Sequence, residues 1–273
     1  MKRKLNRRKL LKWELFMIKN HIQFWKNFYK IRYYQSITKK QTVAEIKFLK
    51  EFLPQSKYKN ILDFICGFGR HSLELAKAGY NVEGFDIDRN SINKARSAIK
   101  KFNLININLY VKDAMGFQKR NVFDAAACLY SSIGFLDSYS NEKIFKNLLR
   151  SVKIGGRIII DVMNPRWAIK NLKPFIEKTT AYQGIIYKIK HQRKIINNPL
   201  REKNQIVFLN TNNNRKYKIF YVLRLFSLDE IRQKLKKYHF KIYKEFGSFN
   251  KAVISSKNQR IIIIADKNKF PGK

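Results

Sequence analysis

The spacing of hydrophobic residues changes near residue 60, and the change predicts two kinds of structure. Up to Pro54, apolar positions recur every three or four residues, which predicts amphipathic helices. The repeating positions are Leu10, Leu11, Leu15, Ile18 and Ile22 in one stretch, and Val43, Ile46, Leu49 and Phe52 or Leu53 in the next. From Asn60 onward, short apolar runs alternate with helical patterns. We therefore expect a helical N-terminal lead-in, which could act as a lid, over residues 1–54 and a separate domain over residues 55–273.

Five apolar runs after residue 60 have the length of strands. They cover residues 60–66, 80–88, 107–115, 122–133 and 157–164. The sequence between them predicts helices over residues 70–79, 91–102 and 141–152. Regular alternation of strands and helices is typical of a mostly parallel sheet with helices on both faces. The sequence thus predicts an α/β fold.

The alternation lapses after Pro165. Between about residues 174 and 226, the pattern predicts two or three antiparallel strands separated by asparagine-rich turns. Ser227, followed three residues later by Glu230, predicts a helix that begins with a capping box. Residues 241–249 and 259–267 then read as two closing strands that pair antiparallel. The segment at about 174–226 is therefore an antiparallel β insertion after the fifth strand.

The composition indicates a folded protein of the cytoplasm. Hydrophobic residues make up 45% of the 273 residues and aromatic residues 14%, which excludes intrinsic disorder. Cys66 and Cys128 are too few for a disulfide framework and lack metal-ligand spacing, so we expect no metal site. No apolar run reaches the roughly 18 residues that a membrane span needs, and the first residues lack the apolar core of a signal peptide.

The chain is strongly basic, and two explanations stay open. Its 58 Lys and Arg residues against 19 Asp and Glu residues give a formal net charge of +39. Such a charge attracts phosphate backbones, so RNA is a possible partner. However, lysine is enriched together with asparagine and isoleucine and is dispersed along the chain, as A+T-rich codons would produce. We favour this compositional origin.

A glycine-containing turn after the first strand carries the most informative chemistry. Asp63 ends the strand, and Gly67 and Gly69 follow in a Gly-x-Gly turn that opens a helix. Such a turn lets the backbone approach a ligand at a helix N-terminus. The third glycine of a dinucleotide fingerprint is replaced by Ser72, and the carboxylate of Asp63 would repel a pyrophosphate. A ligand with an ammonium group suits that carboxylate better, and S-adenosylmethionine is such a ligand.

The ends of the next three strands agree with this interpretation. Asp86 lies about twenty residues after the turn, where a carboxylate can accept both ribose hydroxyls. Asp113 ends the third strand and can accept a hydrogen bond from the adenine amino group. Tyr130 and the two serines after it end the fourth strand at the same edge of the sheet. We interpret Asp88 as a helix cap.

These residues resemble the motifs of class I S-adenosylmethionine-dependent methyltransferases. ILDFICGFGRHSLELAKAGYNVEGFDID is similar to their first two motifs, and VFDAAACLYSSIGFLD and SVKIGGRIIIDVMNP are similar to the fourth-strand and fifth-strand motifs. Ile65 departs from the family, which often has glycine there, so we expect a slightly tighter turn. The resemblance implies a Rossmann-like, seven-stranded sheet. It also implies an S-adenosylmethionine site formed by Asp63, Cys66, Gly67, Gly69, Arg70, Asp86, Ile87, Asp113, Ala114 and Tyr130.

The resemblance is closest to the small-molecule branch, including amino-sugar N-methyltransferases. We therefore expect in-line methyl transfer to an N or O nucleophile of a small molecule, with the β insertion as a cap over the acceptor. A flap that only covers the sheet, or that forms a dimer contact, is the alternative for that segment. An rRNA or tRNA methyltransferase and a non-catalytic relic are the competing functions. The sequence assigns no catalytic residue, acceptor or oligomeric state; Cys66 and His71 are interpreted as packing or capping residues, and Arg70 as a contact of the cofactor.

Overall fold

The computed structural model describes residues 37–135, 138–182 and 184–269. The helix expected around Leu10–Ile22 lies outside these residues. The described chain forms two compact units. The larger unit comprises residues 37–133, 138–170 and 226–269, and the smaller unit comprises residues 134–135, 171–182 and 184–225. The roles predicted for the lead-in and for the β insertion remain predictions.

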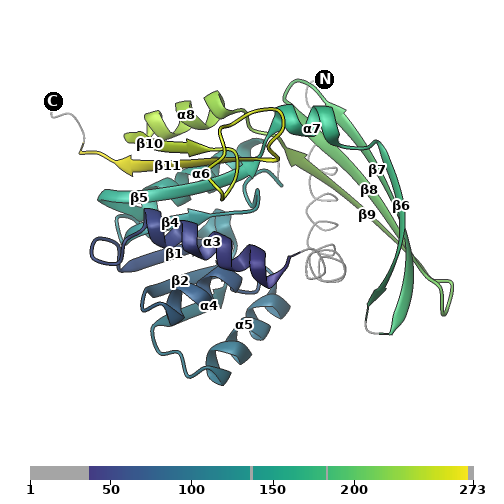
Figure 1. Cartoon of the computed structure of the whole chain (residues 1–273), viewed down its shortest axis with the longest axis horizontal. Coiled ribbons are helices and arrows are strands. Elements are labelled where there is room, and N and C mark those ends of the chain that lie inside the picture. The colour runs from purple at the N-terminus through teal and green to yellow at the C-terminus, as the bar shows by residue number, and fades with distance from the viewer. Residues whose placement is uncertain (1–36, 136–137, 183, 270–273) are drawn as a thin grey trace, which may run out of the picture. The chain divides into compact units, whose positions relative to one another are not determined.

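The larger unit is built on a seven-stranded sheet with the order β10-β11-β5-β4-β1-β2-β3 (Figure 1). Its strands are β1 (Asn60–Phe64), β2 (Asn81–Asp86), β3 (Ile107–Val111), β4 (Phe123–Cys128), β5 (Val152–Met163), β10 (Phe240–Phe246) and β11 (Arg260–Lys267). Strands β1 to β5 pair in parallel, whereas β11 runs antiparallel to both β5 and β10. The predicted mostly parallel sheet and the antiparallel closing pair are confirmed.

Helices cover both faces of this sheet (Figure 1). They are α3 (Lys39–Phe52), α4 (Arg70–Lys77), α5 (Arg89–Lys101), α6 (Ser138–Ser151) and α8 (Leu228–Lys237). A 3-10 turn η1 (Ala114–Gly116) follows β3, and the short helix α7 (Pro165–Asn171) follows β5. The predicted capping box of Ser227 and Glu230 is present at the start of α8. The central strands are almost entirely apolar and buried, as expected for strands covered on both faces.

The buried face of α3 differs from the prediction. Val43 was expected on this face, but it is 68% exposed. The buried positions are Glu45, Phe48, Leu49 and Phe52. This set also has helical spacing, but it includes a carboxylate. The prediction was wrong because it counted apolar residues only, whereas Glu45 has buried partners that compensate its charge.

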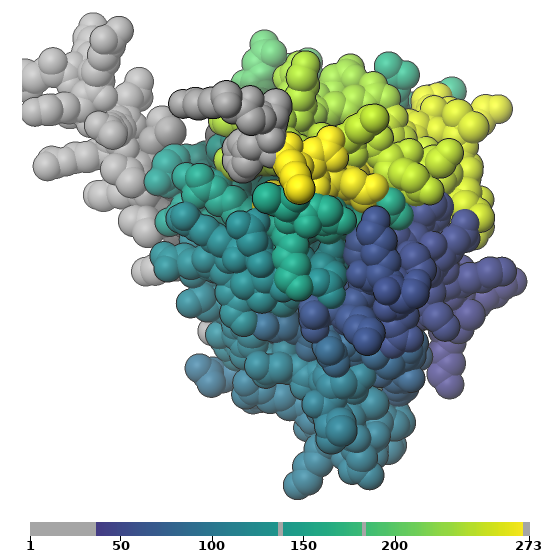
Figure 2. Space-filling model, turned by 90° about the vertical axis from the view of Figure 1, so that its left-hand side faces the viewer, coloured from purple at the N-terminus to yellow at the C-terminus, as the bar shows by residue number. Residues whose placement is uncertain are grey.

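Aromatic contacts fix the C-terminal half of α3 against the end of the chain. The Phe48 ring lies 5.7 Å from that of Phe246 and 5.3 Å from that of Phe249. At the surface, Lys251 pairs with Glu51 at 2.9 Å. Figure 2 shows the two segments side by side, with the purple helix next to the yellow-green C-terminal region. Residues about 200 positions apart therefore form one part of the core.

The smaller unit is a four-stranded antiparallel sheet with the order β6-β7-β8-β9 (Figure 1). Its strands are β6 (Phe175–Tyr182), β7 (Ile185–Ile196), β8 (Arg201–Asn210) and β9 (Lys216–Arg224). The β insertion is confirmed, but it has four strands instead of two or three. The additional strand arises because residues 179–190 contain a turn at Gly184 (φ +76°) and contribute to both β6 and β7.

One face of the smaller sheet carries an apolar cluster. Its buried members alternate along the strands and are Tyr187, Ile189, Ile206, Phe208, Ile219 and Tyr221. The residues between them are more exposed. This period of two places apolar side chains on one face and polar side chains on the other. None of the helices in the described ranges is long and apolar enough to cross a membrane.

Candidate functional site

Asp63 is buried at the carboxyl end of β1. Its side chain is 3% exposed and accepts a hydrogen bond of 2.5 Å from the Ser72 hydroxyl in α4. Burial raises the pKa of Asp63 above its ordinary value. In the sheet order, β1 lies beside β4. The chain connections that follow these two strands run in opposite directions, and α/β proteins bind ligands at such a switch point, at the carboxyl ends of the strands.

The turn after β1 has three residues in the left-handed region. They are Ile65 (φ +63°), Gly67 (φ +57°) and Gly69 (φ +72°). A side chain at Gly69 would lie 2.6 Å from a Leu109 methyl carbon, so close packing requires glycine there. At Gly67, by contrast, no atom lies within 4 Å of where a Cβ would be, so the turn faces open space. Ile65 thus adopts a backbone conformation that favours glycine.

Asp86 ends β2 directly beside this turn. Its carboxylate accepts hydrogen bonds from the backbone N–H groups of Gly67 and Asp88, each at 2.9 Å. Burial raises the pKa of Asp86 to about 6, and the nearby carboxylates of Asp88 and Asp63 act in the same direction. Ile87 is 40% exposed next to it. Asp88 caps α5, as predicted, by accepting from the N–H groups of Asn90 and Ser91.

Asp113 and Ala114 lie at the end of β3. The exposed Asp113 side chain caps η1 by accepting from the N–H of Met115 at 2.8 Å. Ala114 is buried, and its carbonyl accepts a hydrogen bond of 2.9 Å from the Asn147 side chain. The third strand ends at Val111, not at Met115 as predicted, because this cap turns the chain. Three predicted acidic residues thus lie at the ends of β1, β2 and β3.

Tyr130 follows β4 in a left-handed conformation, with φ +60°. Its N–H donates to Asp161 Oδ2 at 2.8 Å. Its phenol group donates to Glu45 and accepts from Gln41 Nε2 at 2.7 Å. A non-glycine residue in this region is strained, and such strain persists only where surrounding contacts impose it. Hydrogen bonds of both its backbone N–H and its phenol group therefore fix the position of Tyr130.

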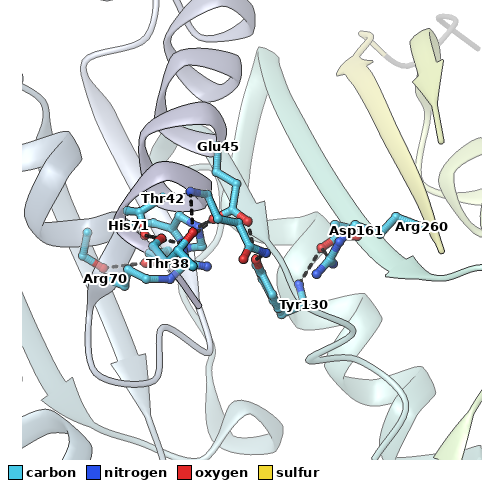
Figure 3. Close-up of polar contacts among 11 residues, drawn as sticks. Thr38, Thr42, Glu45, Arg70, His71, Tyr130, Asp161 and Arg260 are labelled. Atoms are coloured by element: carbon cyan, nitrogen blue, oxygen red, sulfur yellow. Dashed lines mark hydrogen bonds and ion pairs between the residues drawn. The ribbon is translucent and has the colours of Figure 1, made fainter. Parts of the chain in front are cut away.

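Glu45 of α3 lies at the centre of a buried network with Arg70, His71 and Tyr130 (Figure 3). Its carboxylate accepts from Arg70 Nη1 and contacts His71 Nε2 at 2.9 Å. Burial alone would raise the pKa of Glu45, but the hydrogen bond and charge of His71, with the charge of Arg70, lower it to about 2. Arg70 also donates to the Thr42 hydroxyl at 3.0 Å. We name these four residues the Glu45 network.

A second ion pair joins β5 to β11. Asp161 is buried and pairs with the guanidinium of Arg260. That guanidinium also lies 4.0 Å from the centroid of the Tyr130 ring (Figure 3). Glu45, Asp161 and Arg260 were missed in the sequence analysis. The signals that could have found Glu45 and Asp161 are an acid on the apolar stripe of α3 and an acid within the apolar run of β5.

The arrangement gives no activated nucleophile among the described cysteines. Burial, followed by the charges of Asp63 and Asp86, raises the pKa of the Cys66 thiol well above its ordinary value. Cys128 is buried and its thiol pKa is raised in the same way. The described residues also contain no group of histidine, cysteine, aspartate or glutamate side chains suited to hold a metal ion.

A family comparison identifies the kind of domain that carries this turn. The family model described as "Methyltransferase domain" matches residues 61–156, which include the turn, Asp63, Asp86, Asp113 and Tyr130. Residues 61–156 therefore form a methyltransferase domain. S-adenosylmethionine is the cofactor expected from the sequence, and structures of similar fold have been solved with it bound.

Relatives of this methyltransferase resemble it beyond that segment. The Bacillus subtilis protein YqeM, named as a methyltransferase, is 23% identical over 227 residues, which are 82% of this chain and 89% of YqeM. An S-adenosylmethionine-dependent methyltransferase structure from Clostridium acetobutylicum has a TM-score of 0.71 at 16% identity and covers 88% of this chain and 96% of its own. The sugar N-methyltransferase KedS8 from Streptoalloteichus has a TM-score of 0.67 at 16% identity, with 89% and 94% covered. The two structures share the Rossmann-like fold of this methyltransferase.

The residues present fit this cofactor. The open space beside Gly67 leaves room for a ligand against the backbone, and a side chain there would fill it. Asp86 is bound only by backbone N–H groups among the described residues, so its carboxylate retains lone pairs for hydroxyl donors. Asp63 supplies a buried negative charge at the same edge.

Proposed function

We propose that this methyltransferase acts on a small molecule and transfers the methyl group to a nitrogen or oxygen atom. The observation that carries the proposal is the four-stranded sheet that enters the chain after β5 and α7. The structural likeness to the sugar N-methyltransferase KedS8 covers 89% of this chain. The uncovered share is smaller than the insertion, so the likeness includes at least part of the insertion. An insertion that leaves the sheet at its carboxyl edge suits an acceptor cap.

We further propose roles for the cofactor-site residues. The carboxylate of Asp63 attracts the cofactor's ammonium group, and Gly67 and Gly69 allow its close approach to the turn. Asp86 accepts the two ribose hydroxyls, and Asp113 accepts the adenine amino group. The remaining proposed contacts are Ile87 and Ala114 beside the adenine and Cys66, Arg70 and Tyr130 near the methionine end. In this proposal, Arg70 and Tyr130 are positioned by Glu45, to which both are hydrogen bonded.

The reaction needs little side-chain chemistry. The sulfonium of the bound cofactor supplies an electrophilic methyl group. The acceptor's lone pair would form the new bond to that carbon as the carbon–sulfur bond broke, and the acceptor's proton would pass to a water molecule or buffer base. Orientation of the two reactants can supply about 7–11 kcal/mol of the barrier reduction. A general base is needed only for an acceptor that must lose its proton during attack, and we assign none.

The test is to replace residues 174–225 by a short glycine/serine linker. The cofactor residues proposed above all precede this segment, so calorimetry should show unchanged S-adenosylmethionine affinity. Transfer of radiolabelled methyl groups to components of a metabolite extract should be lost. Retained transfer in the shortened protein, or transfer by the intact protein to total RNA and not to metabolites, would contradict the proposal.

A further inference from the structure

The smaller sheet has an exposed face that is strongly basic. Because side chains alternate along a strand, the burial of Tyr187 and Ile189 places Lys188 and Lys190 on the opposite face. The strand register extends this face across β8 and β9. We name it the basic face; its six exposed lysines are Lys188, Lys190, Lys194, Lys203, Lys216 and Lys218. By the register, Glu177 is the acidic side chain that the described strands place on it, and it lies 3.4 Å from Lys190.

A row of four residues crosses the basic face from one edge strand to the other. Phe175, Gln192, Gln205 and Phe220 are successive register partners on β6, β7, β8 and β9. Phe175 is 48% exposed, and Lys218 lies 5.2 Å from the Phe220 ring centroid. With neighbouring strands about 4.8 Å apart, the row spans about 14 Å. Two aromatic rings thus flank two amide side chains, with lysines on both sides of the row.

We propose that the basic face binds single-stranded nucleic acid. Lysines contact backbone phosphates, aromatic rings stack on bases, and amide groups hydrogen bond to base edges. The basic face carries all three kinds of group on one exposed sheet. An anionic membrane would attract the same lysines, but a membrane-binding surface inserts a contiguous apolar patch. On this face, glutamines separate the two rings, and lysines on β7 and β9 flank Val207 and Leu209 of β8. This inference goes beyond the proposed function, since it concerns binding and no methyl transfer.

The experiment measures binding of the full chain to a fluorescein-labelled 16-nucleotide single-stranded RNA by fluorescence anisotropy over a salt series. One variant combines Lys188→Gln, Lys190→Gln, Lys216→Gln and Lys218→Gln. Its matched control removes the same charge from four exposed lysines of the larger unit, with Lys143→Gln, Lys146→Gln, Lys236→Gln and Lys241→Gln. Each lost phosphate contact lowers the slope of log K against log salt by about 0.7. We expect the slope to fall by up to about 3 in the basic-face variant and to change much less in the control.

Two further variants separate base stacking from charge. Phe175→Ala and Phe220→Ala should each weaken RNA binding about fivefold or more. Neither should weaken binding to heparin, a polyanion without bases. S-adenosylmethionine affinity and thermal melting check that each variant is folded, and Phe175→Ala, at the more exposed position, remains informative if Phe220→Ala unfolds.

Three outcomes would overturn the proposal. Equal decreases of the salt-dependence slope in the two lysine variants would show that RNA binding depends only on the net charge of the protein. Unchanged RNA binding in Phe175→Ala would remove the stacking surface. Cosedimentation with phosphatidylserine vesicles that depends on the same lysines, without measurable RNA binding at 0.1 M salt, would assign the basic face to membranes.

Discussion

The two halves of the carboxyl edge of the larger sheet use their polar side chains in different ways. At the ends of β1, β2 and β3, Asp63, Asp86 and Asp113 are bonded to a serine hydroxyl or to backbone N–H groups. At the ends of β4 and β5, Tyr130 and Asp161 are bonded to charged side chains of α3 and β11. Carboxylates that are bonded only to neutral donors keep lone pairs for a ligand, whereas ion pairs between distant segments of the chain hold their members in place. The first half is therefore suited to binding and the second to positioning.

The largest effect should come from Glu45→Ala. Removing one partner of a buried charge cluster leaves the others uncompensated, so we expect the free energy of unfolding to fall by about 3–5 kcal/mol. Glu51→Ala on the same helix is the control, because its pair with Lys251 is exposed and should contribute less than about 1 kcal/mol. Denaturant unfolding measures both. Similar small losses in the two variants would show that the Glu45 network does not stabilise the fold.

Asp86→Ala should affect binding and not folding. We expect S-adenosylmethionine affinity to fall by about 1–3 kcal/mol, since the variant lacks a charged acceptor for two hydroxyl groups. Calorimetric titration measures the dissociation constant, and denaturant unfolding should show a stability close to that of the parent at pH 8. If Asp86→Ala bound the cofactor as tightly as the parent, the ribose assignment would be wrong.

The raised pKa of Asp86 predicts a pH dependence of the same binding step. The charged carboxylate of Asp86 accepts hydrogen bonds from hydroxyl groups better than the protonated acid does. Because the pKa of Asp86 is about 6, this side chain becomes protonated as the pH falls below 6. Affinity should be constant above about pH 7 and should fall by up to tenfold per pH unit below 6. Asp86→Asn should bind more weakly at pH 8 and lose this part of the dependence. The same slope in the parent and in Asp86→Asn would assign the titration to another group.

The smallest effect should come from Tyr130→Phe. The change removes the hydrogen bonds of the phenol group to Glu45 and Gln41 while the backbone bond to Asp161 remains. We expect a loss of about 1 kcal/mol in the free energy of unfolding. A loss as large as that of Glu45→Ala would mean that the phenol group, and not the charge cluster, holds this half of the edge.

Local patterns predicted one half of the carboxyl edge better than the other. Asp63, Asp86 and Asp113 each lie near the end of an apolar run, so the order of runs and turns placed them at strand ends. Glu45 acts through Arg70 and His71, which are 25 and 26 positions away in the chain. The pair of Asp161 with Arg260 exists because β11 lies directly beside β5. Sequence spacing carries no information on such a pairing, which depends on the final order of strands.

The position of β11 has a consequence for synthesis on the ribosome. This strand is near the end of the chain, yet it lies between β5 and β10 and pairs with both. Until residues 260–267 leave the exit tunnel, the nascent protein exposes the edge of β5, whose residues Ile158–Ile160 are otherwise completely buried. An unpaired apolar edge recruits other chains. A stop codon placed just before Arg260 should therefore yield an aggregating protein, and translation that pauses there should depend on chaperones.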